Sequence, residues 1–190
     1  MKNVLKIVVV LVLAFVGYVI YILANPVSPK DTVVYNSGDA NFEVVYSRPY
    51  KKDRLIFGFE EDGALVPFGK YWRTGANAAT TFETTTDVLF NGEKLKAGKY
   101  ALFTFPYKNS WTVTLSSKSD VFFAIEQPDP KFDVLKTSVD VKPMEKTLEQ
   151  LTVDFLQDTS FVNMRLMWDK TSISIPVSYT HLTLPTTPVV

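Results

Sequence analysis

The 190-residue sequence contains no cysteine and only one histidine, His181. Without cysteine, the chain has no disulfide and no thiolate that serves as a nucleophile or a metal ligand. A Ser-His-Asp mechanism would depend on His181 alone. Because His181 lies in a C-terminal segment that we expect to be non-native, we do not expect it to act as a base. The sequence therefore predicts no catalytic residue, no metal site and no cofactor.

An excess of charge of either sign is also missing. Lys+Arg and Asp+Glu both number 20, so the formal net charge is +0. Proteins that bind nucleic acid usually carry a basic face, and we expect no nucleic-acid partner here. Aromatic residues, in contrast, make up 14% of the chain. Aromatic and β-branched residues suit a half-buried pleated surface, which favours an all-β fold.

One long apolar segment begins the chain. Residues 7–24 carry no charge, and as a helix they would span about 27 Å, close to the thickness of the bilayer core. Lys2 and Lys6 precede this segment, which places the N-terminus in the cytoplasm. We expect residues 1–25 to be a transmembrane signal anchor that contacts the membrane through residues 7–24. A cleaved signal peptide ending near Ala24 is the alternative, and both interpretations put the remaining chain outside the cytoplasm.

Strand patterns dominate the sequence after a proline-containing linker at residues 26–31. About ten short strands separated by turn residues predict an antiparallel β-sandwich over residues 32–177. Asn91-Gly92 predicts a type I′ hairpin, and residues 145–151 are the best helical candidate. The expected strands are 32–35, 41–47, 79–85, 87–90, 99–105, 111–117, 120–126, 133–141, 148–157, 161–168 and 171–177.

The final segment, residues 178–190 (SYTHLTLPTTPVV), carries no charge. It resembles a string that recurs at the ends of unrelated reading frames from environmental sequencing, where translated adapter sequence is read through. We expect a non-native, disordered tail. An unstructured native tail rich in Thr and Pro is the alternative.

Several motifs occur in a recognisable order: YSRPYKKDRLIFG at residues 46–58, LVPFGKYWRTGANAATTF at 65–82, LKAGKYALFTFP at 95–106 and WTVTL at 111–115. Together with LMWDKTSISIPV near the end, they make residues 33–177 resemble the uncharacterised bacterial family "domain of unknown function 2911". The resemblance implies an exported or membrane-anchored bacterial β-protein of the periplasm, with no established activity to carry over. Two features depart from the family pattern: Ala78 replaces an acidic residue, and Glu60-Glu61-Asp62 is an insertion.

The segment WRTGAN, residues 72–77, has a structural interpretation. Trp72 would anchor a corner between the sheets. Gly75 would adopt a positive φ, and Asn77 tolerates the left-handed region. Arg73 would pair with a carboxylate or donate to loop carbonyls. Trp111 and Trp168 are expected to fill the core. On this interpretation the domain is a non-catalytic envelope interaction or structural module, with an envelope protein or a glycan as its partner.

Two other functions stay open at this point. A cationic pocket for a glycan or a small anion would use Arg with Asn and an aromatic wall, although Asp53 and the acidic insertion lie in the same window. A hydrolase would need two facing carboxylates, for which Glu60, Glu61, Asp62 and Glu83 are the candidates. The candidate ligand-binding residues are Arg48, Tyr50, Arg54, Trp72, Arg73 and Asn77.

Overall fold

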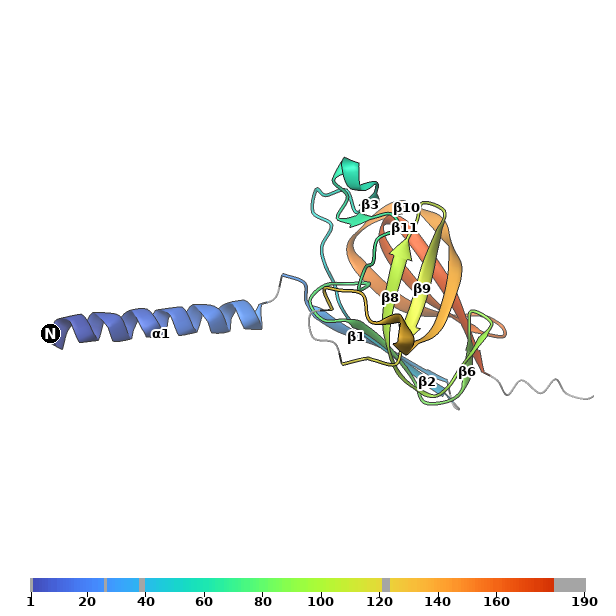
Figure 1. Ribbon diagram of the computed structural model, residues 1–190, viewed down its shortest axis with the longest axis horizontal. Helices are drawn as coiled ribbons and strands as arrows, with labels where there is room; N and C mark the ends of the chain where they lie inside the picture. The colour runs from blue at the N-terminus through green and yellow to red at the C-terminus, as the bar shows by residue number, and fades with distance from the viewer. Residues whose placement is uncertain (1, 26, 38–39, 121–123, 180–190) are drawn as a thin grey trace, which may run out of the picture.

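The structure, a computed structural model, describes residues 2–25, 27–37, 40–120 and 124–179. One helix, α1 (Lys2–Ala24), projects away from a body of β strands (Figure 1). The prediction of an all-β, antiparallel domain preceded by one apolar helix is confirmed. The strands are β1 (Lys30–Ser37), β2 (Ala40–Ser47), β3 (Phe57–Gly58), β4 (Val66–Pro67), β5 (Thr80–Thr84), β6 (Val88–Phe90), β7 (Glu93–Leu95), β8 (Gly98–Pro106), β9 (Ser110–Ser116), β10 (Asp133–Gln157) and β11 (Val162–Tyr179).

Nine of the described strands form one antiparallel sheet in the order β1-β2-β5-β8-β9-β10-β11-β6-β7. The short strands β3 and β4 pair separately and in parallel. The large sheet folds over along β10, so its two halves face each other as layers (Figure 1). Phe82 of β5 and Phe90 of β6 meet in the space between them, with ring centroids 5.2 Å apart. The two layers of the sandwich are therefore parts of one continuous sheet.

β10 differs most from the sequence-based expectation. We expected two strands, 133–141 and 148–157, with a helical candidate at 145–151 between them. The structure has one 25-residue strand, whose first part pairs with β9 and whose second part pairs with β11. The register shifts between Pro143 and Leu148 and again before Thr152. Because proline has no N–H for the ladder, Pro143 favours such an irregularity, and the strand bends from one layer into the other.

The core follows the two-residue period of the strands. In β2, Phe42, Val44 and Tyr46 are buried while the residues between them are less so, as expected when alternate side chains point to opposite faces. Trp111 of β9 and Trp168 of β11 are fully buried. Their predicted place in the core is confirmed, and both belong to the cluster that supports the candidate site.

Of the predicted local features, the hairpin at Asn91-Gly92 is confirmed, whereas a predicted strand and the predicted end of the domain differ from the structure. Asn91 and Gly92 have φ of 50° and 84° and join the paired residues Phe90 and Glu93, which confirms the type I′ hairpin. The expected strand 120–126 is wrong for its described residues, which lie in no strand. β11 continues to Tyr179, which pairs with Val88, two residues past the expected end of the domain. Residues 180–190, with His181, lie outside the described residues.

α1 contains a stretch that suits a bilayer. Residues Asn3–Ile22 form a 20-residue segment with a mean hydropathy of 2.7, and none of it is buried against the domain. At about 1.5 Å per residue this segment is roughly 30 Å long. The helix is therefore long and apolar enough to cross a membrane. Its connection to the domain passes through residues 25–29.

Candidate functional site

The corner at Trp72 lies between β4 and β5. Trp72 exchanges two backbone hydrogen bonds with Thr104 of β8, at 2.8 and 2.9 Å. Its ring stacks on Trp168 with centroids 5.9 Å apart, and the rings of Trp111 and Phe57 contact it edge-on at 5.7 Å. The indole Nε1 donates to the Gly75 carbonyl at 3.2 Å. Trp72 thus fixes the turn that follows it to the aromatic core.

The backbone of this turn differs from the expectation in one respect. Asn77 has a φ of 61°, so its predicted left-handed conformation is confirmed. Gly75 does not need a positive φ; the second left-handed residue is Thr74, with a φ of 57°. A Cβ on Gly75 would lie 2.9 Å from the Ser47 carbonyl oxygen. Glycine is required at this position because the backbone of β2 approaches it closely.

Hydroxyl groups satisfy the buried polar atoms beneath the turn. The Thr74 hydroxyl lies 3.0 Å from the Thr104 hydroxyl and donates to the Trp72 carbonyl at 3.3 Å. The Thr80 hydroxyl donates to the Thr74 carbonyl at 2.8 Å. Because an unpaired buried polar group destabilises a fold, these contacts help the strained Thr74 conformation to persist.

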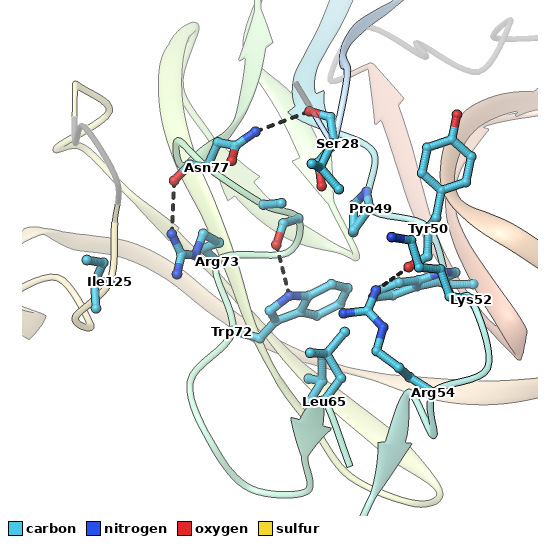
Figure 2. Close-up of a pocket in the computed structure, with 15 residues that line it drawn as sticks. Ser28, Pro49, Tyr50, Lys52, Arg54, Leu65, Trp72, Arg73, Asn77 and Ile125 are labelled. Carbon is cyan, nitrogen blue, oxygen red and sulfur yellow. Dashed lines mark hydrogen bonds between the residues drawn. The ribbon is translucent and has the colours of Figure 1, made fainter. Parts of the chain in front are cut away.

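Above the corner lies a cavity of about 490 Å³. It is bounded by the 72–77 turn, the loop between β2 and β3, β4, and residues next to α1 (Figure 2). Five of the six candidate ligand-binding residues line it. Arg73 and Asn77 lie on one side, Lys52 and Arg54 on the other, and the Trp72 indole lies between them (Figure 2). The lining residues are Val27, Ser28, Pro49, Tyr50, Lys52, Arg54, Leu65, Val66, Trp72, Arg73, Gly75, Ala76, Asn77, Ile125 and Trp168.

Cations from two loops reach this cavity. The Arg73 guanidinium donates to the Asn77 carbonyl at 2.9 Å. The Arg54 guanidinium donates to the Lys51 carbonyl at 3.0 Å and to the Tyr50 carbonyl, so the loop holds it in place. Both guanidinium groups keep a positive charge at the cavity while they stabilise their own loops.

Carboxylates are absent from the described lining. Glu149 contacts the lining from outside the cavity, where its Oε1 accepts from the Lys52 backbone N–H at 2.7 Å. Lys51, next to Lys52, forms an ion pair with Asp169 at 3.3 Å. The charged residues of the described lining are therefore Lys52, Arg54 and Arg73.

Arg48 is the candidate that the structure places elsewhere. Its guanidinium forms an ion pair with Asp31 at 3.2 Å and donates to the Leu151 carbonyl at 3.0 Å and the Thr152 hydroxyl at 3.1 Å. Arg48 connects β1, β2 and β10 and does not line the cavity. Tyr50 lines the cavity, but its ring points away from Arg73 and Asn77 (Figure 2).

Four acids were the candidates for hydrolytic chemistry, and none of them lines the cavity. Glu60 pairs with Lys70 at 3.1 Å, and Glu83 of β5 pairs with Lys99 at 3.5 Å. Glu61 and Asp62 are exposed on a short 3₁₀ turn. No two of these acids face each other across the cavity. In the described part of the chain, no group of three or more acids or histidines is arranged to hold a metal ion.

Tyr71 faces away from the cavity because neighbouring residues in an extended segment point to opposite sides. Its ring contacts Phe103 at 5.4 Å, and its hydroxyl donates to the Ala124 carbonyl at 3.1 Å. Burial raises the pKa of the Tyr71 hydroxyl, while the nearby Arg73 charge partly opposes that rise. Tyr71 therefore packs against β8 and binds the backbone at Ala124, and it does not line the cavity.

Sequence reasoning missed the part of the lining next to α1. The Asn77 side-chain amide donates to the Ser28 carbonyl at 3.1 Å, which brings the segment after α1 to the cavity (Figure 2). Val27 and Ile125 complete this side. Nothing in the sequence around Ser28 indicates this contact, because it depends on a partner 49 positions away.

Residues 28–177 match a known family, described as "Protein of unknown function (DUF2911)". The chain belongs to this family. No curated protein and no solved structure matches the chain. The DUF2911 match begins at Ser28, so it includes every described residue of the cavity lining except Val27. The candidate site is thus a feature of the DUF2911 region itself.

Proposed function

We propose that this DUF2911 domain is a non-catalytic binding module, anchored to a membrane by α1, that holds a small anionic ligand in the cavity at Trp72. The observation that carries the proposal is the composition of the lining, in which Lys52, Arg54 and Arg73 converge and no described residue is acidic. Guanidinium groups suit phosphate and carboxylate ligands because their N–H groups form paired, charge-assisted hydrogen bonds.

The size and walls of the cavity support a small molecule as the ligand. A volume of about 490 Å³ falls within the range of roughly 300–1,000 Å³ typical of ligand sites. Val27, Leu65 and Ile125, which are exposed, provide apolar surface beside the cations, and side chains of this kind pack against sugar rings and alkyl groups. Phosphorylated or carboxylated sugars and glycerol phosphates have this combination of anionic and apolar surface.

The proposed location follows from α1. Lys2 and Lys6 at its start favour a cytoplasmic N-terminus by the positive-inside rule, and we propose that the β domain lies outside, in the periplasm or cell envelope of a bacterium. We propose that residues 1–25 are the anchor and that the domain begins with β1, two residues earlier than the sequence indicates. Ion pairs among the described residues support an open site, since none of them includes Lys52 or Arg54.

The test is thermal unfolding of the full chain in a neutral detergent, with inorganic phosphate, glycerol 3-phosphate, a hexose 6-phosphate or the matching neutral hexose. A ligand at one hundred times its Kd stabilises the folded state by about 2.7 kcal/mol, which raises the Tm by about 8 °C in a domain of this size. We expect the phosphorylated compounds to raise the Tm and the neutral hexose to leave it unchanged.

Variants make this test specific to the cavity. Lys52→Gln with Arg54→Gln changes two exposed residues, so the domain should fold and should lose the response. Lys94→Gln with Lys146→Gln is the matched control, because these exposed lysines lie outside the lining. A shift that persists in the first pair, or disappears in the control pair, would show that the anion binds elsewhere. No response to any anion would favour a purely structural corner.

A further inference from the structure

The cavity lies next to the point where the chain leaves α1. Ser28, which lines the cavity, is four Cα–Cα steps from Ala24, the last residue of the helix. Steps of about 3.8 Å limit this separation to about 15 Å. In addition, Ser28 is fixed to the domain by the amide of Asn77, and Arg48 N–H donates to the Pro29 carbonyl at 2.8 Å. With α1 across a bilayer, the cavity is therefore held close to the lipid headgroups.

Exposed apolar side chains line parts of the cavity. Val27 and Ile125 are 74% and 72% exposed, although both line the cavity. Leu65 and Tyr50 are also exposed large side chains on the lining. An exposed apolar rim on a water-soluble surface commonly marks an interaction site, and Tyr is favoured at the membrane–water interface. We call Val27, Tyr50, Leu65 and Ile125 the apolar rim.

We propose that the ligand is the headgroup of an anionic phospholipid from the leaflet next to the domain. This inference rests on the proposed function and specifies its ligand. The phosphate lies among Lys52, Arg54 and Arg73, and the glyceryl ester region contacts the apolar rim. Each part of the lipid then meets matching chemistry: cations for the phosphate, and apolar side chains for the start of the acyl chains.

The arrangement favours a lipid over a dissolved anion for two reasons. First, the anchor fixes the cavity within reach of the headgroup layer, where the local concentration of lipid phosphate greatly exceeds that of a dilute solute. Second, a free phosphate ion has no apolar surface to bury against the apolar rim, whereas a lipid does. The basic residues of the cavity add to the second point, because Lys and Arg close to an anionic bilayer are attracted to its surface.

The experiment measures the apparent affinity of the full chain in neutral detergent for phosphatidylglycerol, phosphatidylcholine and free glycerol 3-phosphate. Tryptophan fluorescence is the readout, because all three Trp residues belong to the aromatic cluster beneath the cavity. We expect saturable binding of phosphatidylglycerol, weaker binding of glycerol 3-phosphate and no response to phosphatidylcholine. Since each cation near an anionic headgroup contributes about fivefold, Lys52→Gln with Arg54→Gln should weaken phosphatidylglycerol binding roughly 25-fold.

The rim provides the decisive comparison. Val27→Ser with Ile125→Ser should weaken the binding of phosphatidylglycerol and leave that of glycerol 3-phosphate unchanged. Val34→Ser with Leu156→Ser is the control, because these apolar side chains are also exposed, at 52% and 49%, but lie outside the cavity. The control pair should bind both compounds as the wild type does.

The possible failures separate this inference from the function on which it rests. If glycerol 3-phosphate binds as tightly as phosphatidylglycerol, or the rim variants affect neither compound, the ligand is a soluble anion and the lipid inference is wrong. Equal binding of phosphatidylcholine would also overturn it, since selection for negative charge would be absent. If neither phosphatidylglycerol nor glycerol 3-phosphate binds, the anion-binding function falls as well.

Discussion

Replacing Gly75 by alanine tests the geometry of the Trp72 corner. The added Cβ would lie 2.9 Å from the Ser47 carbonyl oxygen and 3.1 Å from the Thr80 hydroxyl. The first of these atoms belongs to the backbone of β2, where Ser47 pairs with Lys30 of β1 and has little freedom to move. Overpacking of this kind costs about 1–3 kcal/mol. Alanine also reduces the conformational entropy of the unfolded chain, which stabilises the folded state by about 0.4–1 kcal/mol and partly offsets this cost.

The net expectation for Gly75→Ala is a loss of about 1.3 kcal/mol in the free energy of unfolding, which lowers the Tm by about 4 °C. Tryptophan fluorescence during thermal unfolding of the full chain measures it. Gly58→Ala is the matched control, because the three atoms nearest to that Cβ all belong to side chains, with the flexible tip of Leu55 at 3.0 Å and the Ala64 Cβ at 3.3 Å. We expect Gly58→Ala to stay within about 1 kcal/mol of the wild type.

The same substitution should also disturb the cavity, since the Gly75 carbonyl accepts the Trp72 indole N–H. Equal Tm values for Gly75→Ala and Gly58→Ala would refute the argument from close approach. In that case the backbone of β2 would have to yield readily, and the glycine would need another explanation.

Three further predictions concern single contacts. Burial raises the pKa of the Tyr46 hydroxyl above its usual value of 10.0. The folded state therefore favours the neutral form and loses stability as the pH rises above 10.0. Tyr46→Phe should show a shallower decline of Tm with pH in this range. Asn77→Ala should be less stable than Asn77→Gly by about 1 kcal/mol in the free energy of unfolding, because only glycine keeps the left-handed φ without strain. The difference is measured as a lower Tm for Asn77→Ala. The Arg165–Asp154 pair, bonded at 2.7 and 2.6 Å but about one third exposed, should contribute less than about 1 kcal/mol in a double-mutant cycle and less still at high salt.

Local patterns were sufficient to predict much of the domain. Asn91-Gly92 specifies its turn through residues that tolerate positive φ, and the aromatic and β-branched residues of 41–47 favour the strand that β2 forms. Asn77 belongs to the same group, since its conformation depends on its own side chain and backbone. These features share one property: each is decided by residues that are neighbours in the sequence.

Features that depend on distant partners were not predictable. Nothing near Pro143 indicates that one strand continues from one layer of the sandwich to the other, because the continuity comes from pairing with β9 and β11. Arg48 resembles Arg54 and Arg73 in the sequence, yet Asp31 and the carbonyl of Leu151 draw it away from the cavity. The contact between Asn77 and Ser28 likewise exists only in the folded chain.

The position of the β6–β7 hairpin has a consequence for synthesis of the chain. In the sheet order, this hairpin adjoins β11 alone, and β11 is complete only at Tyr179, roughly 80 residues after the hairpin ends. At about 5–20 residues per second, the ribosome needs roughly 4–16 s to supply the partner strand. During that interval Val88, Phe90 and Leu95, all buried in the finished domain, present an apolar surface that a chaperone has time to recognise.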